Sequence, residues 1–384
     1  MPDRVYLDWN ATTPLRPEAR QAMAAAWEVA GNPSSVHAEG RQARRLVEDA
    51  RGAIAAAVGA RPQDVAFTSG GTEANALALT PGLRRGAGEP VRRLLVSAIE
   101  HTSVLSGGRF SPEAIGTIQV TGSGLIDIDH LRRLLAEGPP TLVSVMLANN
   151  ETGALQPVGE VADIVHEAGG LLHADAIQAL GKIPFDIKSM KADLVTLSAH
   201  KIGGPKGAGA LVLADEAQGL EPLLRGGGQE LGRRAGTENV AGISAFGVAT
   251  AVAMAALAGD AARLRALRER LEKGLQQTPG MIVFSEGTPR LPNTTLFTVP
   301  GLKAETAVIG FDLGGIAVSS GSACSSGKVQ PSHVLAAIGF SRELAQGAVR
   351  LSLGWSTSEA DIDLALQAWR KLADALLKGR RNTA

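Results

Sequence analysis

The sequence predicts an α/β protein in which a mostly parallel sheet is covered by helices on both faces. Between residues 64 and 215, short apolar runs alternate with segments of helical periodicity. The apolar runs are almost continuously hydrophobic, which is typical of parallel strands that are buried on both sides. Strand–helix alternation of this kind indicates the α/β class. The predicted strands cover residues 65–67, 94–96, 142–147, 171–172 and 194–197.

Helical spacing predicts the elements that pack around this sheet. Val161, Ile164 and Val165 fall on one face of a helix over residues 158–168. Before the sheet, a second helical face consists of Ala43, Leu46, Val47, Ala50, Ile54 and Val58.

A capping pattern predicts the helix near the C-terminus. Ser358 is followed three residues later by Asp361, the spacing of a capping box that opens a helix. The apolar face of this helix is predicted to bury Ile362, Leu366, Trp369, Leu372 and Leu376.

A change of pattern near residue 250 predicts a second, smaller α/β domain. A charged amphipathic helix over residues 262–277 is followed by short strands near 282–284 and 295–299. The 384 residues suit two or three domains of about 150 residues each. We predict a large domain over residues 16–250 and a small domain formed by residues 1–15 and 251–384, which carries Cys324 and Arg350.

Residues 241–259 contain no charge and are nearly long enough to span a bilayer. The stretch is mostly alanine and glycine, with few strongly apolar side chains, and it follows a very polar segment. A helix buried inside a large water-soluble protein is therefore the preferred interpretation.

Composition and charge exclude several classes of partner. Lys and Arg together number 38, as do Asp and Glu, so no net charge attracts nucleic acid or an anionic membrane. The single cysteine excludes an internal disulfide and favours a reducing compartment. The first residues lack a basic-then-apolar signal pattern, so we expect a cytoplasmic protein that binds neither nucleic acid nor membrane.

Polar clusters follow each predicted strand. In an open parallel sheet, ligands bind beyond the carboxyl ends of the strands, so the five clusters are expected to share one crevice. They are Thr68 to Glu73, Glu100 with His101, Asn149 to Gly153, His173 to Gln178, and Ser198 to Lys201 with the glycine-rich residues 203–207.

Taken together, the clusters suit pyridoxal phosphate. Lys201 can form a Schiff base, Asp175 can keep the pyridine nitrogen protonated, and a glycine-rich helix start can hold the phosphate. Each residue also has an ordinary interpretation by itself. His101 could be a surface or hydrogen-bonded histidine, Asp175 a turn or cap residue, and Lys201 a solvated lysine.

Two competing sites are rejected. His173 and Asp175 could begin a metal site, but no third ligand follows at a suitable spacing, so no intrinsic metal is expected. Residues 321–328 resemble a phosphate-binding P-loop. They have one residue too many between the glycines, and Val329 stands where Ser or Thr must reach magnesium.

Cys324 lies among serines and glycines at residues 319–327, the composition of an exposed loop. A buried structural cysteine normally has apolar neighbours, so the run favours a reactive thiol. A small hydrophobic residue in a tight turn is the alternative.

With these residues in place, the chain resembles the cysteine desulfurases of the nitrogen-fixation and iron–sulfur-cluster type. These are class-V, aspartate-aminotransferase-like enzymes of pyridoxal-phosphate fold type I. The resemblance runs over nearly the whole chain. Its motifs are YLDWNATTP, GNPSSVHAEG, FTSGGTEAN, NNETG, HADAIQ, SAHKIGGPKG, GGGQELGRRAGTENV, SSGSACSSG and VRLSLGW. The family pattern often has an aromatic residue where Gly203 stands and a second asparagine where Ala76 stands.

The resemblance implies a role for each site residue. Lys201 would be the Schiff-base lysine, Cys324 the nucleophile, and His101 a ring-stacking residue that assists proton transfer. The other cofactor-binding residues would be Gly71, Thr72, Asn150, Asp175, Gln178, Ser198, His200 and Thr237. Thr237 would reach the cofactor of a second subunit, which implies a homodimer. Asn150 and Arg350 would position the substrate, with Arg350 taking its carboxylate.

The implied activity converts L-cysteine to L-alanine and transfers the sulfur to Cys324 as a persulfide. The sulfur would pass to an acceptor such as an iron–sulfur scaffold protein, and Cys324 would contact an iron–sulfur cluster transiently. Two alternatives remain. One is a selenocysteine lyase or aminotransferase on the same scaffold, and the other is a cofactor-free sulfur carrier.

Overall fold

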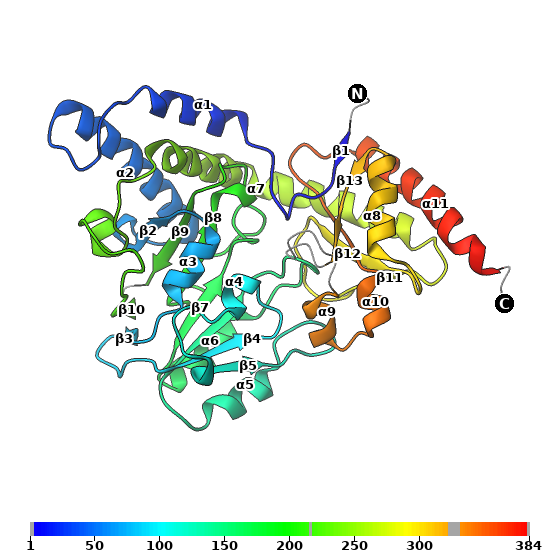
Figure 1. Cartoon of the computed structure of the whole chain (residues 1–384), viewed down its shortest axis with the longest axis horizontal. Coiled ribbons are helices and arrows are strands. Elements are labelled where there is room, and N and C mark those ends of the chain that lie inside the picture. Colours follow the sequence, from blue (N-terminus) through cyan, green and yellow to red (C-terminus); the bar gives the residue numbers. More distant parts are fainter. Residues whose placement is uncertain (1–3, 215–216, 322–330, 382–384) are drawn as a thin grey trace.

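The computed structural model describes residues 4–214, 217–321 and 331–381, with side chains up to residue 375. A large sheet and a small sheet lie side by side, and the long helix α7 (Val240–Leu275) runs along both (Figure 1). Helices pack against each sheet, so the predicted α/β class is confirmed.

The large sheet has seven strands in the order β2-β9-β8-β7-β6-β4-β5. The strands are β2 (Val65–Thr68), β4 (Arg93–Ser97), β5 (Ile115–Ile118), β6 (Thr141–Met146), β7 (Leu171–Asp175), β8 (Leu194–Ser198) and β9 (Gly209–Leu213). Strands β8, β7, β6, β4 and β5 pair in parallel, whereas β9 runs antiparallel to both of its neighbours. Strand β2 therefore runs in the same direction as β8, and six carboxyl ends share one edge. The sequence prediction omitted β5 and β9.

Helices cover both faces of the large sheet. Helices α2 (Ala38–Val58), α5 (Ile128–Leu135), α6 (Val158–Glu167) and part of α7 pack on one face. The short helices α3 (Gly71–Ala78) and α4 (Thr102–Leu105) lie on the other. Neighbouring strand residues enter opposite cores: Leu95 packs in the first and Leu94 in the second. This two-sided burial explains the continuous apolar runs in the strands.

Helix α7 corrects one prediction from the sequence. Residues 241–259 and 262–277 were expected to form two helices, but a single 36-residue helix covers both segments. By length and composition alone it could span a membrane, yet 56% of its most apolar window is buried inside the molecule. It packs on α2 and on α1 (Pro17–Trp27), as the preferred buried-helix interpretation requires.

The small sheet has the antiparallel order β11-β12-β15-β14, and a separate parallel pair joins β1 to β13. These strands are β1 (Val5–Tyr6), β11 (Ile282–Val283), β12 (Thr294–Thr298), β13 (Ile316–Ala317), β14 (Ser319–Ser320) and β15 (Val349–Ser352). The helices here are α8 (Ala304–Leu313), α9 (His333–Ile338), α10 (Arg342–Gln346) and α11 (Glu359–Arg381). The two-residue strands β3 (Arg84–Arg85) and β10 (Ala217–Gln218) pair beside the large sheet.

The C-terminal helix begins as its sequence predicts. Ser358 and Asp361 exchange backbone-to-side-chain hydrogen bonds, which confirms the capping box. Trp369 is fully buried and packs edge-on against Phe297 of β12. The division of the chain at residue 250 stays a prediction, and α7 runs across that point without a break.

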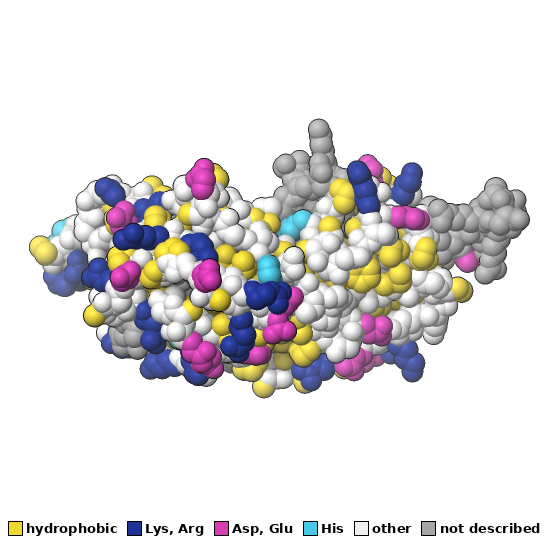
Figure 2. Space-filling view, turned by 90° about the horizontal axis from the view of Figure 1, so that it is seen from below, with side chains coloured by type: hydrophobic (Ala, Val, Ile, Leu, Met, Phe, Trp, Pro, Cys, Tyr) yellow, Lys and Arg dark blue, Asp and Glu magenta, His cyan; other side chains and the backbone are white. Residues whose placement is uncertain are grey.

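Charged side chains of both signs are interspersed on the face shown in Figure 2. This mixture agrees with the equal numbers of acidic and basic residues in the chain.

Candidate active site

The predicted polar clusters meet at one edge of the large sheet. Strands β2, β4, β6, β7 and β8 all end there because they run in the same direction. A cavity of about 260 Å³ opens at this edge. Ten predicted residues line it: Gly71, Thr72, His101, Asn150, Asp175, Gln178, Ser198, His200, Lys201 and Arg350. Arg350 comes from β15, so the small sheet supplies part of the wall.

Lys201 stands at the end of a one-turn helix that directly follows β8. Its Nζ donates hydrogen bonds to the backbone oxygens of Asn10 (2.6 Å) and Ala11 (2.8 Å). Both acceptors belong to the N-terminal segment, which therefore holds the lysine amine in the cavity wall.

Asp175 ends strand β7 and is 5% exposed. Its Oδ1 accepts from the backbone N–H of Ile177, and its Oδ2 accepts from Nδ2 of Asn75 (3.0 Å each). Burial raises the pKa of Asp175, while these two hydrogen bonds and the charges of His101 and Lys201 oppose the rise. These hydrogen bonds and charges offset part of the cost of burying this carboxylate.

A chain of buried hydrogen bonds fixes the orientation of Asn75. Its Nδ2 donates to Asp175 and to Ser103, so its Oδ1 is the acceptor for the hydroxyl of Thr196 (2.6 Å). Thr196 in turn accepts from Nε2 of His173 (3.0 Å), whose Nδ1 accepts from the hydroxyl of Ser144 (2.8 Å). Burial lowers the pKa of His173 to about 3, so this histidine is neutral. Both of its nitrogens serve this network.

The same network reaches His101. The hydroxyl of Ser103 accepts from Asn75 and donates to Nδ1 of His101 (2.8 Å), which also accepts from the Ser103 backbone N–H (3.2 Å). Since Nδ1 accepts both bonds, the proton of the neutral ring is on Nε2. Burial lowers the pKa of His101, which favours the neutral ring.

The start of α3 and the end of β8 form a candidate anion site. Gly71 and Thr72 are in the first turn of α3, where backbone N–H groups lack helical partners. The hydroxyl of Ser198 is buried and, among the described residues, has no hydrogen-bond partner. A Cβ at Gly209 would lie 2.5 Å from the carbonyl carbon of Gly70, so only glycine allows this close approach. A phosphate here would give Ser198 the partner it lacks.

His200 borders this anion site. Its Nδ1 is 3.2 Å from the hydroxyl of Thr12. Burial, reinforced by the charge of Lys201, lowers its pKa to about 4, so the ring is neutral at pH 7.

Arg350 is 1% exposed and is fixed from two sides. Its Nη1 donates to the backbone oxygen of Asn150 (3.1 Å), and its Nη2 pairs with Asp8 Oδ1 (2.7 Å). Its buried Nε has no partner among the described residues. A guanidinium held in this way can bind a substrate carboxylate from the cavity.

Two further carboxyl groups are buried beside the cavity. Burial and the nearby charge of Asp175 raise the pKa of Glu100 well above its usual value, and one of its oxygens accepts from the Met146 backbone N–H. Burial raises the pKa of Glu151 to about 7, and its Oε2 accepts from the hydroxyl of Ser332.

One predicted site residue lies elsewhere, and another is outside the described residues. Thr237 lines a different cavity, formed with Ser69 and Glu230 on the large-sheet side. It is not among the residues that line the cavity of Lys201 in the same chain. Cys324 lies outside the described residues.

A family model described as aminotransferase class-V matches residues 5–365. The chain belongs to this family. A cysteine desulfurase of Cereibacter sphaeroides is 44% identical to this class-V chain, and the match covers 97% of each. An IscS-like cysteine desulfurase of Mycobacterium tuberculosis is 41% identical, covering 98% of this chain and 97% of the relative. These relatives confirm the resemblance to cysteine desulfurases.

A solved structure has the same fold as this class-V chain. The X-ray structure of a NifS-like protein from Rickettsia africae superposes with a TM-score of 0.88 at 38% identity, covering 97% of this chain and 99% of that one. The predicted fold type is therefore confirmed.

Sequence reasoning missed several residues that hold the site together. Asp8, Asn10 and Asn75 stand in motifs that carried the family resemblance, but the motifs assigned them no contacts. Lys182 could have been noticed in the sequence, because it is a lysine inside the apolar run that follows the HADAIQ motif. Their partners are far apart in the sequence, so spacing alone could not identify them.

Proposed function

We propose that this class-V aminotransferase-family protein is a pyridoxal-phosphate-dependent cysteine desulfurase. It would convert L-cysteine to L-alanine and pass the sulfur to Cys324 as a persulfide. The observation that carries the proposal is the meeting of Lys201, Asp175, His101 and Arg350 around one cavity. The desulfurase relatives support the reaction type.

The residues present fit pyridoxal phosphate. Gly71, Thr72, Ser198 and His200 would hold the phosphate, and the buried Ser198 hydroxyl, which has no partner among the described residues, supports this assignment. Asp175 would pair with the ring nitrogen, and Gln178 with the ring hydroxyl. Bound there, the cofactor would supply an electron sink for charge that develops at the substrate Cα.

Arg350 and Asn150 would bind and orient the substrate. The Arg350 guanidinium is buried and already aligned by Asp8 and the Asn150 backbone. It therefore offers a charge-assisted hydrogen bond to the α-carboxylate at little further cost in side-chain entropy.

Lys201 and His101 would move the protons. The Lys201 amine, once released from the cofactor, is the candidate base for the Cα proton. In its neutral form His101 carries its proton on Nε2, so the ring can donate a hydrogen bond from that nitrogen. We therefore propose that His101 assists proton transfer, as the family resemblance implies, by offering the hydrogen bond from Nε2.

Cys324 would complete the reaction as a thiolate. Its sulfur would attack the substrate sulfur, so an S–S bond forms while the Cβ–S bond breaks with its electron pair passing to carbon. Proton uptake at that carbon and return of a proton to Cα then yield alanine. The persulfide on Cys324 would pass to an acceptor protein such as an iron–sulfur scaffold.

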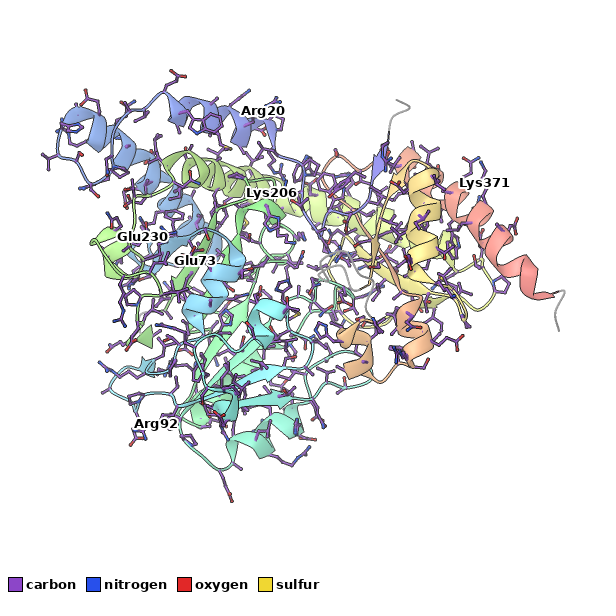
Figure 3. The ribbon with its side chains drawn as sticks, in the orientation of Figure 1. Arg20, Glu73, Arg92, Lys206, Glu230 and Lys371 are labelled. Atoms are coloured by element: carbon purple, nitrogen blue, oxygen red, sulfur yellow. The ribbon has the colours of Figure 1, made fainter. Side chains whose placement is uncertain are left out.

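A homodimer is part of the proposal. Two ion pairs hold the segment that carries Thr237. Glu230 and Arg51 form a buried pair (2.7 Å), and Arg234 and Glu73 form a partly buried pair (3.0 Å). Glu73 and Glu230 are marked on the left-hand, large-sheet side in Figure 3. The same segment presents Leu231, which is 73% exposed at a backbone φ of 57°. A second copy covering this segment would bring Thr237 to its partner's cofactor. We expect this dimer in the cytoplasm.

Lys201→Ala tests the cofactor assignment. The wild type, loaded with pyridoxal phosphate, should show the visible absorption band of lysine-bound cofactor, and Lys201→Ala should not. Lys206→Ala is the matched control, because Lys206 is exposed, lies five residues further on and should leave the band intact. A band of wild-type intensity in Lys201→Ala would refute the assignment.

A further inference from the structure

Lys182 is a buried lysine that the proposed mechanism does not use. It is 8% exposed, and no described carboxylate lies within ion-pair distance of its amine. Lysine is almost never buried in this way without a charged partner, because desolvating the ammonium is costly. Its place in the fold therefore calls for a specific role.

The chain turns sharply to bring Lys182 behind the cavity wall. Gly181 has a φ of 69°, and a Cβ there would lie 2.9 Å from the Cβ of Ala253 on α7. Only glycine combines this backbone conformation with such close packing. The turn directs Lys182 back toward Gln178, four residues earlier.

The amine of Lys182 has two amide oxygens as partners. Its Nζ donates to Oε1 of Gln178 (2.5 Å) and to Oδ1 of Asn10 (3.1 Å). Burial, followed by the charges of Lys201 and Arg350, lowers the pKa of Lys182 well below its usual value.

These contacts fix which end of the Gln178 amide is the donor. The backbone oxygen of Asn10 can only accept, so the Gln178 atom 2.9 Å from it is Nε2. The other end of the amide, which faces Lys182, is therefore the oxygen Oε1. One N–H of Nε2 is used in the bond to Asn10. Since the oxygen is already bonded to Lys182, the second N–H of Nε2 is left for an acceptor in the cavity that Gln178 lines.

We propose that Lys182 is a positioning residue that acts through Gln178. By binding Oε1, it holds the amide so that a donor faces the cavity and selects an oxygen acceptor on the ligand. This inference rests on the proposed function, in which that acceptor is the ring hydroxyl oxygen of pyridoxal phosphate.

A double-mutant cycle on cofactor affinity tests the role. Pyridoxal phosphate is titrated into cofactor-stripped wild type, Lys182→Met, Gln178→Ala and the double variant, and its Kd is measured by absorbance. Each single variant should weaken binding by about 10-fold, the value of one hydrogen bond near 1.4 kcal/mol. The double variant should bind within about twofold of Gln178→Ala, because Lys182 acts only through that side chain.

Controls separate this inference from a structural role. Lys188→Met removes an exposed lysine six residues away and should leave the Kd unchanged. Thermal melts check folding, and Lys182→Leu, which also has no hydrogen-bond donor, replaces Lys182→Met if the latter does not fold. An unchanged Kd in the Lys182 variant, or additive losses in the double variant, would overturn the inference. A wild type that binds no cofactor would overturn the proposed function as well.

Discussion

Buried ionisable groups dominate this molecule at the scale of single residues. Asp175, Glu100, Glu151 and Lys182 all lie within or against the candidate site with little exposed surface. Burial shifts the pKa of each toward its neutral form. Such groups destabilise a fold unless hydrogen bonds compensate, and their concentration here is typical of a catalytic centre. For Asp175 the compensating donors are the Ile177 backbone N–H and the amide of Asn75, which also connects Asp175 to His101 through Ser103.

Glu151 gives a stability test with a defined sign. Its pKa in the folded chain is about 7, above the usual value, so burial favours the protonated form. Its contribution to the free energy of unfolding is therefore fully present below pH about 4.5 and is lost as the pH rises through about 7. Between pH 5 and 8 the loss amounts to about 2 to 3 kcal/mol. Glutamine at position 151 cannot titrate. Free energies of unfolding from urea titrations should therefore fall by about 2 to 3 kcal/mol more in the wild type than in Glu151→Gln between pH 5 and 8. Equal losses in both proteins would contradict the assignment.

At the scale of elements, a glycine allows α7 to pack closely against α2. A Cβ at Gly247 would lie 2.5 Å from Cα of Ala50, so glycine lets α7 approach α2 closely. Gly259 lies on the same helix, is exposed, and a Cβ there would meet nothing within 4 Å.

The two glycines make a matched pair of substitutions. Gly247→Ala should destabilise the protein by about 1 to 3 kcal/mol, because overpacking against α2 outweighs the better helix propensity. Gly259→Ala should instead stabilise it by up to about 1 kcal/mol. Free energies of unfolding from urea titrations check both. A gain in stability for Gly247→Ala would show that the contact with α2 is looser than described.

Most elements could be predicted from the sequence because each has a regular pattern of buried residues. Strands β4, β6, β7 and β8 of the large sheet are buried on both faces, so continuous apolar runs in the sequence marked them. Strand β5 is only partly buried, and β9 follows a glycine-rich loop, so neither stood out as a separate strand. The single helix α7 was divided because its first half is uncharged and its second half is rich in charge.

The site residues that come directly after a strand could be predicted from the sequence. Polar residues directly after apolar runs identified Asp175, Ser198 and Lys201, and the structure places them around one cavity. The supporting contacts were not predictable. Asn10 lies 191 positions from Lys201, and Asn75 lies 100 positions from Asp175, so only the folded chain brings them together.

At the scale of the whole molecule, the cavity is shared between two sheets and, in our proposal, between two chains. Lys201 and Asp175 come from the large sheet, and Arg350 comes from the small sheet. Thr237 lies in a different cavity of the same chain. The site is therefore expected to be complete only in a dimer.

Sedimentation equilibrium tests this oligomeric state. We expect a particle of twice the 39.6 kDa chain mass at micromolar concentration. Leu231→Asp, which places a charge on the exposed leucine of the Thr237 segment, should shift the protein toward the monomer. A wild-type monomer would contradict the shared site.

The central claim is that the chain removes sulfur from L-cysteine through Cys324. The most direct test incubates wild type and Cys324→Ala, both loaded with pyridoxal phosphate, with L-cysteine and a reductant, and measures alanine and sulfide together. The wild type should form the two products in equal amounts. Cys324→Ala should keep the absorption band of the bound cofactor but release no sulfide. Full sulfide production by Cys324→Ala would contradict the claim.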